Sequence, residues 1–200
     1  MSIFSYPRRR ALRLAAAGAL MLGLAACGKD EPTFQGSDIT GTHLGSALAM
    51  TDNTGQPRTL ADYKDKVVVV FFGFTQCPDV CPTSMAQLAH TMEILGPEAD
   101  QVQVLMITVD PERDTVPILD AYVKAFNPNF GGLTGTPEQL SATAKSFRAY
   151  YSKVPGPRPD EYTMDHGSSF YLIDKDGEAR VLLRGDASAE TVAHDIKQLL

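Results

Sequence analysis

An apolar run from Val67 to Phe72 leads directly into a segment that carries two cysteines four positions apart, Cys77 and Cys81. The run is β-branched and then aromatic, without polar alternation, which predicts a strand that is covered on both faces. After the second cysteine, apolar residues recur at helical spacing over 84–95 and stop at a Gly-Pro pair. The sequence therefore predicts a central buried strand, a loop and a helix, with the cysteines where the helix begins.

The rest of the chain continues this alternation of strands and helices. Further strands are predicted at 102–109, 169–174 and 179–183, and further helices at 118–126, 136–150 and 191–200. The βαβ order of the first half implies parallel strands, and a turn-rich segment at 52–55 predicts an N-terminal hairpin. We therefore expect an α/β chain with a thioredoxin-like fold, in which helices flank a central mixed sheet that the hairpin extends.

The first 26 residues have the pattern of a signal peptide. Four arginines precede an apolar run of about 13 residues, which is short for a bilayer-spanning helix of roughly 20 residues. The run ends in Leu24-Ala25-Ala26-Cys27, which resembles the lipobox of bacterial lipoproteins; an ordinary cleaved signal is the alternative. We expect a lipoprotein-type signal at 1–26, a flexible tether at 27–42 that starts at a lipidated Cys27, and a folded domain at 43–200. The domain would then be lipid-anchored on the periplasmic side of a bacterial membrane.

Charge and cysteine count limit the partners and the chemistry. Without residues 1–26 the chain has 14 basic and 24 acidic side chains, a balance of −10. This balance disfavours nucleic acid and anionic lipid as binding partners. Lipidation of Cys27 would leave Cys77 and Cys81 as one pair, which in an oxidising periplasm can be a disulfide, a dithiol or a metal site.

The spacing of Cys77 and Cys81 suits both metal binding and redox chemistry. In helical geometry it places both sulfurs on one face, close enough to chelate one ion or to form a disulfide. A helix N-terminus presents free N–H groups and the positive end of the helix dipole, so we expect lowered thiol pKa values. Soft thiolates select Cu(I), and imidazole suits both Cu(I) and Cu(II), so one well-placed histidine would complete a copper site.

Four histidines are candidates for that third ligand. His43 near the tether, His90 in the helix after the cysteines and His194 in the last helix are expected to be structural or solvated. His166 lies at the end of a segment, 154–165, that is rich in proline and charge and is expected to be a long exposed loop. It precedes a predicted strand that should approach the cysteine loop, yet the residues alone leave its role open.

Three separated motifs resemble the Sco/SenC family. They are 66–69 with 73–82, then 109–115, then 165–166 with 171–174. The similarity covers about residues 40–200, with the motifs in the family's order. The resemblance implies a thioredoxin-like fold and one copper, as Cu(I) or Cu(II), bound by Cys77, Cys81 and His166. It also implies a partner, the binuclear copper site of cytochrome c oxidase subunit II or another periplasmic copper acceptor.

Two functions remain open at this point. The first is a copper metallochaperone that assists assembly of the oxidase copper site. The second is a thiol-disulfide oxidoreductase in which Cys77 and Cys81 keep the acceptor's cysteines reduced and His166 is optional. A general thioredoxin-type enzyme is disfavoured, because three residues rather than two separate the cysteines and no proline stands at 167–169.

Several neighbours of the three candidate ligands carry weaker expectations. Asp79 and Asp165 are candidates for outer hydrogen-bond partners or a weak oxygen ligand, and are otherwise solvated. Gly167 departs from the family pattern and is expected to loosen the loop after His166. The charged segment 110–114 is expected to be a capped loop with a surface ion-pair cluster, or else a docking site for a partner.

Overall fold

The computed structural model describes residues 32–158 and 160–200. The expected signal peptide at 1–26 and the expected lipidation site Cys27 therefore lie outside the described residues. Within the described part, no helix combines the length and the apolar character that crossing a membrane requires.

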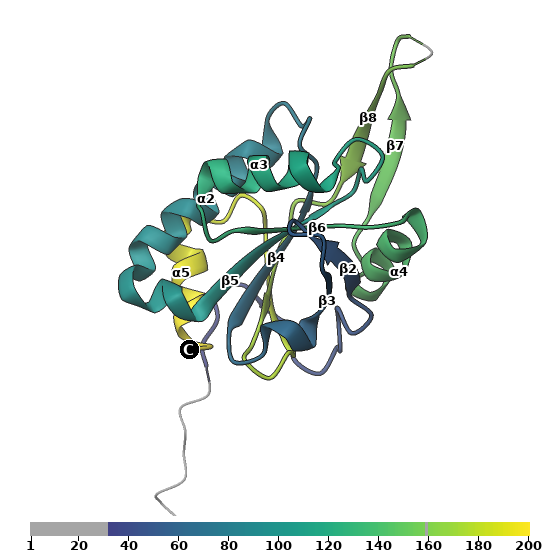
Figure 1. Cartoon of the computed structure of the whole chain (residues 1–200). Helices are drawn as coiled ribbons and strands as arrows, with labels where there is room; N and C mark the ends of the chain where they lie inside the picture. Colours follow the sequence, from purple (N-terminus) through teal and green to yellow (C-terminus); the bar gives the residue numbers. More distant parts are fainter. Residues whose placement is uncertain (1–31, 159) are drawn as a thin grey trace, which may run out of the picture. The chain divides into compact units, whose positions relative to one another are not determined.

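A mixed eight-stranded sheet forms the centre of the molecule, with the strand order β1-β10-β9-β4-β5-β6-β2-β3 (Figure 1). Its strands are β1 (Ser37–Asp38), β2 (Ala49–Asp52), β3 (Pro57–Thr59), β4 (Val67–Gly73), β5 (Val102–Thr108), β6 (Gly131–Thr134), β9 (Phe170–Ile173) and β10 (Ala179–Leu183). Every residue of β4 is buried, as its unbroken apolar sequence predicts. Because β4 pairs in parallel with β5 and antiparallel with β9, the expected mixed sheet is confirmed. The β2–β3 pair confirms the N-terminal hairpin.

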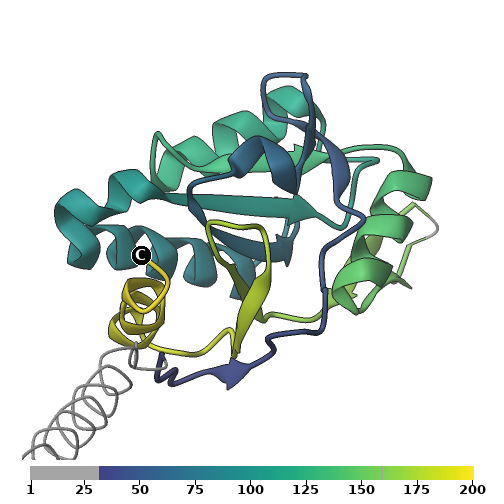
Figure 2. The ribbon, with the colours of Figure 1, turned by 90° about the horizontal axis from the view of Figure 1, so that it is seen from below.

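Four α-helices cover the sheet: α2 (Val80–Leu95), α3 (Val116–Phe126), α4 (Pro137–Phe147) and α5 (Ala189–Lys197). Short 3-10 helices follow β3 (Leu60–Tyr63) and α2 (Gly96–Gln101). Figures 1 and 2 place α2 and α5 together on one side of the sheet and α4 on the other. Helix α4 begins with the expected capping box of Thr136 and Gln139, but it ends before the expected Tyr150, because Arg148 adopts a left-handed conformation.

The expected tether of residues 27–42 is wrong in its second half. Strand β1 pairs with β10 at the edge of the sheet, and the backbone N–H groups of Gln35 and Gly36 each donate a 2.8 Å hydrogen bond to Asp195 on α5. The Asp195 carboxylate is fully buried and needs such donors. A polar segment can therefore form an ordered edge strand, because its backbone groups, not its side chains, make these contacts.

The expected long loop at 154–165 is also wrong. The segment belongs to a separate two-stranded hairpin, β7 (Tyr151–Pro155) and β8 (Tyr162–His166), which projects from the body of the molecule (Figure 1). Tyr151 pairs with His166 at its base, and Pro155 pairs with Tyr162 farther out. Most of its side chains are exposed or half-buried, so the hairpin lacks the apolar alternation by which a strand is recognised in sequence.

Candidate metal centre

The two cysteines lie where the chain passes from β4 into α2. Cys81 is the second residue of α2, whereas Cys77 lies in the preceding loop, where its N–H donates to the carbonyl of Phe74. The expectation that both cysteines share one helical face is therefore wrong in detail. Their sulfurs nevertheless lie close together, because the N–H of Cys81 points back at Cys77 Sγ, 3.4 Å away. The first turn of α2 thus directs a free backbone donor at this sulfur.

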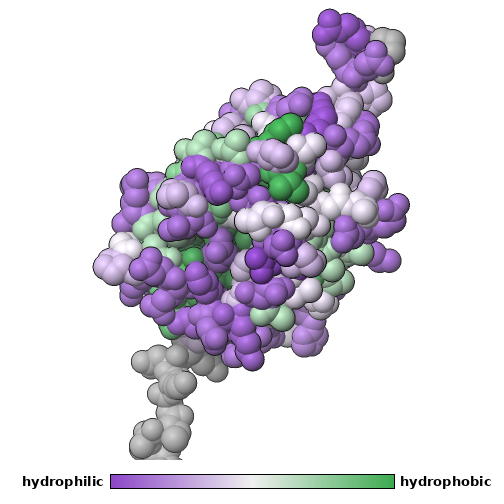
Figure 3. All heavy atoms as spheres, viewed as in Figure 1, coloured by the Kyte–Doolittle hydropathy of each residue, from purple (hydrophilic) through white to green (hydrophobic). Residues whose placement is uncertain are grey.

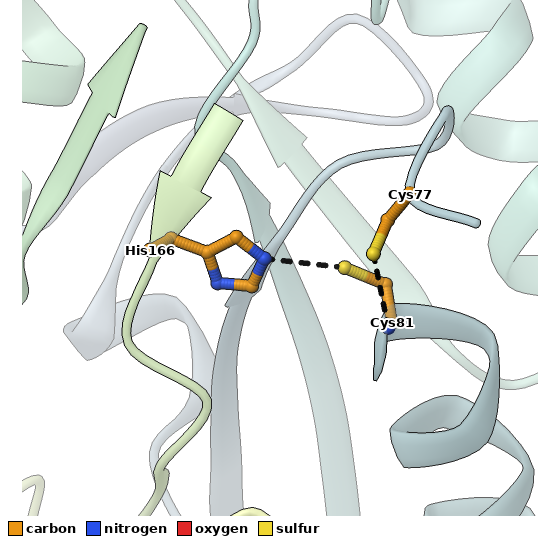
Figure 4. A group of neighbouring side chains, drawn as sticks. All are labelled: Cys77, Cys81 and His166. Atoms are coloured by element: carbon orange, nitrogen blue, oxygen red, sulfur yellow. Dashed lines mark hydrogen bonds between the residues drawn. The ribbon is translucent and has the colours of Figure 1, made fainter. Parts of the chain in front are cut away.

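His166 completes the group from the other side (Figure 4). It is the last residue of β8, and its Nε2 atom lies 3.4 Å from Cys81 Sγ. Its Nδ1 atom lies 2.9 Å from the carbonyl oxygen of Gly167. A proton on Nδ1 satisfies that carbonyl and leaves the Nε2 lone pair facing the sulfurs.

The three side chains can hold one metal ion. One ligand atom from each of Cys77, Cys81 and His166 lies within 4.8 Å of the other two. Three-coordinate metal–sulfur and metal–nitrogen bonds of about 2.3 and 2.0 Å separate the ligand atoms by about 4 Å, so an ion fits with little movement. Cys81 is buried, whereas Cys77 and His166 are half-buried, so an ion held here can be reached from solvent.

Aromatic rings and a glycine shape this group of ligands. The rings of Phe74 and Phe71 stand edge-on to the His166 imidazole, with centroids 5.7 and 6.2 Å away. A Cβ atom on Gly73, the last residue of β4, would lie 3.2 Å from Cys81 Sγ and 2.7 Å from Phe71 Cε1. Glycine therefore leaves the space that the Cys81 sulfur and the Phe71 ring occupy.

The electrostatics of Cys81 differ from the expectation. Burial raises the pKa of the Cys81 thiol, and neighbouring Cys77 and Asp114 raise it further, although a hydrogen bond with the backbone of Phe74 lowers it. The expected lowering by the helix N-terminus is thus wrong for Cys81, because burial is the largest cause and raises the pKa of the thiol. A raised pKa favours the neutral thiol of Cys81, so binding of a metal ion there displaces a proton.

The two aspartates beside the ligands do not join the group. Asp79 is the N-cap residue of α2 and is exposed, and Asp165 is exposed beside His166 on β8. Within the described ranges, the candidate metal-binding group contains Cys77, Cys81 and His166 alone. A role of either aspartate as an outer hydrogen-bond partner stays a prediction.

The structure also shows the surroundings of Gly167, His90 and His194. Gly167 donates its N–H to the carbonyl of Tyr150 and accepts from His166, so both backbone groups are held rather than loosened. His90 is exposed and pairs with Glu93 in α2, and His194 pairs with Asp195 in α5. Neither of these two histidines belongs to the candidate ligand group.

The charged segment 110–114 proves to be an internal support of the site. Asp114 is completely buried and accepts hydrogen bonds from the N–H and hydroxyl groups of Thr75, two residues before Cys77. The expected ion pair forms between Arg113 and Asp110, but Asp110 is buried rather than on the surface. Sequence reasoning missed this role because charged residues after a strand are usually solvated. The signal that could have indicated this role is that Asp110 and Asp114 follow the buried strand β5 within a few residues.

Comparisons with known proteins find similar sequences and similar solved structures. Mouse mitochondrial "Protein SCO2 homolog" is 38% identical over 153 residues, which make up 76% of this chain and 60% of that protein. The copper-bound structure of ScoI from Bradyrhizobium japonicum superposes with a TM-score of 0.71 at 38% identity, over 76% of this chain and 97% of that one. A SCO1/SenC family lipoprotein from Bacillus anthracis gives a TM-score of 0.66 at 32% identity, over 76% and 91%.

These similarities cover the folded domain. The chain spans about 60% of the length of the mitochondrial relatives that it matches. The model of the SCO1/SenC family matches residues 37–200, which include β1 and all three candidate ligands. On this evidence the chain belongs to the SCO1/SenC family.

Proposed function

We propose that the protein binds one copper ion through Cys77, Cys81 and His166 and delivers it to an acceptor protein. The observation that carries this proposal is the 3.4 Å approach of His166 Nε2 to Cys81 Sγ in a group of two sulfurs and one imidazole. Two thiolates favour Cu(I), and the imidazole allows Cu(II) as well, so both oxidation states have suitable ligands. The copper-bound structure of a relative that is 38% identical supports the choice of metal.

Delivery requires that another protein reach the ion. Cys77 and His166 are half-buried, and exposed apolar residues lie on the segments that carry the ligands. Val80 precedes Cys81 and is 45% exposed, and Tyr150 contacts Gly167 and is 59% exposed. Figure 3 shows a mainly hydrophilic face with a small hydrophobic patch between α3 and the base of the β7–β8 hairpin. Apolar side chains around a reachable site support docking of a protein rather than a small molecule.

The acceptor in this proposal is the binuclear copper site of cytochrome c oxidase subunit II, or another periplasmic copper acceptor. The family resemblance supports this choice. The lipobox at 24–27 supports a lipid on Cys27 and a place on the periplasmic side of a bacterial membrane. A similar solved structure is that of a lipoprotein, which supports the same arrangement.

A copper titration of the full chain tests the binding proposal. We expect about one copper per chain in the wild type. His166→Ala should weaken Cu(II) binding by more than the roughly hundredfold that outer partners of metal ligands contribute. His90→Ala is the matched control, because this histidine is exposed on α2, where it pairs with Glu93. A Cu(II) affinity and spectrum unchanged by His166→Ala would contradict the proposal.

A thiol-disulfide oxidoreductase is the second candidate function. Both cysteines are free thiols, and the Cys81 N–H contact at Cys77 Sγ holds the pair close together. This function predicts that the copper-free protein reduces a disulfide in an oxidase copper domain and that Cys77→Ser abolishes the reaction. In cells, His166→Ala separates the two functions, because a dithiol reductase keeps its activity without the imidazole.

The lipid anchor has its own test. We expect radiolabelled palmitate to be incorporated into the wild-type chain and not into Cys27→Ser, with the wild-type protein in the membrane fraction. Cys77→Ser is the control, because it removes a cysteine but leaves the lipobox intact. Equal labelling of the wild type and Cys27→Ser would overturn the assignment.

A further inference from the structure

We propose that Asp110, Arg113 and Tyr162 form a clamp that holds the β7–β8 hairpin against the body and thereby keeps His166 beside Cys81. This inference deepens the proposed copper site and rests on it. His166 stands at the end of a hairpin that belongs to a sheet of its own. An isolated two-stranded hairpin is marginally stable at best, so its position on the body needs other contacts.

Tyr151 and Met164 pack against the core, and Tyr162, at the start of β8, adds polar contacts with the body. Its hydroxyl donates a 2.9 Å hydrogen bond to Asp110 Oδ1. The guanidinium of Arg113 lies 3.8 Å from the centroid of the Tyr162 ring and also donates to the Tyr162 carbonyl, 3.1 Å away. Arg113 pairs with Asp110 in turn, so the three residues contact one another in a closed group. Cation–π contact and charge-assisted hydrogen bonds thus act on one side chain of the hairpin.

The strand carries this contact to His166. Side chains alternate between the two faces of a strand, so Tyr162, Met164 and His166 lie on one face of β8. All three are partly buried, whereas Thr163 and Asp165 on the other face are exposed. Fixing Tyr162 on the body therefore turns the His166 side of the strand toward the cysteines.

The other end of the clamp is joined to the cysteine loop. The N–H of Asp110 donates to the Thr108 hydroxyl, which donates to Asp114 Oδ2 at 2.6 Å. Asp114 in turn accepts from the N–H and hydroxyl groups of Thr75 in the loop that leads to Cys77. A single segment after β5 therefore holds both the hairpin that carries the histidine and the loop that carries the cysteine.

The burial of these contacts separates them from ordinary surface pairs. The Asp110 side chain is 3% exposed, so removal of its partners leaves a buried charge without compensation. Lys153 also lies over the Tyr162 ring, but its ion pair with Glu112 joins side chains that are 47% and 64% exposed. Such exposed ion pairs contribute little to stability. The clamp proper is therefore Asp110, Arg113 and Tyr162.

The clamp should affect the two oxidation states of copper differently. Cu(I) is served by the two soft thiolates, whereas Cu(II) depends more on the imidazole. Loss of the Tyr162 contacts frees the hairpin that carries His166, whereas Asp114 still holds the cysteine loop through Thr75. Its signature is a larger loss of Cu(II) affinity than of Cu(I) affinity.

The test compares Tyr162→Ala, Tyr162→Phe and Thr163→Ala in the full chain. In the metal-free protein, NMR measures the nuclear Overhauser effect between the rings of His166 and Phe74, whose centroids lie 5.7 Å apart. Copper titrations then measure both oxidation states. We expect Tyr162→Ala to lose the ring contact and to bind Cu(II) about ten- to hundredfold more weakly, the usual effect of an outer partner. Tyr162→Phe, which loses only the hydroxyl, should change both readouts in the same direction but less.

Thr163→Ala is the control, and two results would contradict the clamp. Thr163→Ala alters the exposed face of the same strand and should match the wild type. An unchanged His166–Phe74 contact in Tyr162→Ala overturns the clamp, and so does an equal effect of Thr163→Ala. If Tyr162→Ala does not fold, Tyr162→Phe decides by the same readouts. A wild type that binds no copper contradicts the proposed function, whereas the metal-free NMR comparison still judges the clamp.

Discussion

The Nε2 atom of His166 lies 3.4 Å from Cys81 Sγ, although the two residues are 85 positions apart in the chain. A hairpin on one side and a helix start on the other bring these two atoms together. One ligand atom from each of Cys77, Cys81 and His166 lies within 4.8 Å of the other two. The fold thus brings together three side chains that can hold one metal ion.

Substitution of Gly73 tests how tightly the residues around Cys81 are packed. In Gly73→Ala the new Cβ would lie 3.2 Å from Cys81 Sγ and 2.7 Å from Phe71 Cε1, so one of them must move. We expect a loss of about 1–3 kcal/mol in unfolding free energy, as overpacked cores show, together with weaker Cu(I) binding. Thermal unfolding and competition with a Cu(I) chelator measure the two effects. Gly167→Ala is the control, because its Cβ would meet no atom within 4 Å; equal behaviour of the two variants would refute the packing argument.

The two thiols should react at different rates with iodoacetamide in the metal-free protein. Cys81 is fully buried and burial raises the pKa of its thiol, whereas Cys77 is only half-buried. The thiolate is the reacting form, so Cys77 should be modified first and Cys81 should resist. Peptide mass spectrometry after timed quenching follows each site. In denaturant the difference should vanish, and equal rates in the native protein would be inconsistent with this geometry.

Two tyrosine hydroxyls should contribute to stability with opposite sign. The Tyr122 hydroxyl is buried and has no hydrogen-bond partner among the described residues, whereas the Tyr162 hydroxyl donates to Asp110. Tyr122→Phe removes a polar atom that makes no bond, so unfolding free energy should stay constant or rise by up to about 1 kcal/mol. Tyr162→Phe should lower it by about 1.5–3 kcal/mol, the range for a hydrogen bond to a charged group. Urea denaturation of both variants gives the comparison, and destabilisation by Tyr122→Phe would be the contrary result.

The lowered pKa of Asp52 predicts that the free energy of unfolding falls at acid pH. Burial acts to raise the pKa of its carboxyl group, but hydrogen bonds from Thr54, Gln56 and Arg58 outweigh burial and lower it from 3.8 to about 2. A lowered pKa in the folded state stabilises the protein above about pH 4, and this contribution is lost as the pH falls toward 2. The shift corresponds to about 2 kcal/mol. Urea denaturation at several pH values should show this loss in the wild type and not in Asp52→Asn; parallel losses would contradict it.

The elements that the sequence predicted are those with a strong apolar pattern. The unbroken run of β4 appears as a fully buried strand, and the helical spacing after Cys81 appears as α2. These segments form strands or helices because they bury apolar side chains, so their apolar pattern is enough to predict them. The proximity of Cys77 and Cys81 followed from their spacing, although Cys77 lies before the helix and not in it.

The features that escaped prediction depend on contacts between distant backbone and polar groups. The β7–β8 hairpin buries few side chains, and β1 is held by backbone pairing with β10. Asp114 supports the cysteine loop through Thr75, which lies 39 positions earlier. No local sequence pattern predicts such a contact, because the neighbouring residues do not distinguish a buried aspartate from a solvated one. His166 was placed near the cysteines mainly by resemblance, for the same reason.

If Cys27 carries the proposed lipid, the hydrogen bonds from Gln35 and Gly36 to Asp195 limit how far the domain can lie from the membrane. Among the described residues, contacts with the domain start at Thr33, which donates to Gln198. Five residues lie between Cys27 and Thr33, whereas fifteen lie between Cys27 and residue 43. At full extension the link spans about 20 Å, instead of about 50 Å for a tether that ends at residue 42. Under the proposed lipid anchor, the copper site serves acceptors that lie close to the bilayer surface. Copper would then be exchanged between neighbours in the plane of the membrane, without diffusion through the periplasm.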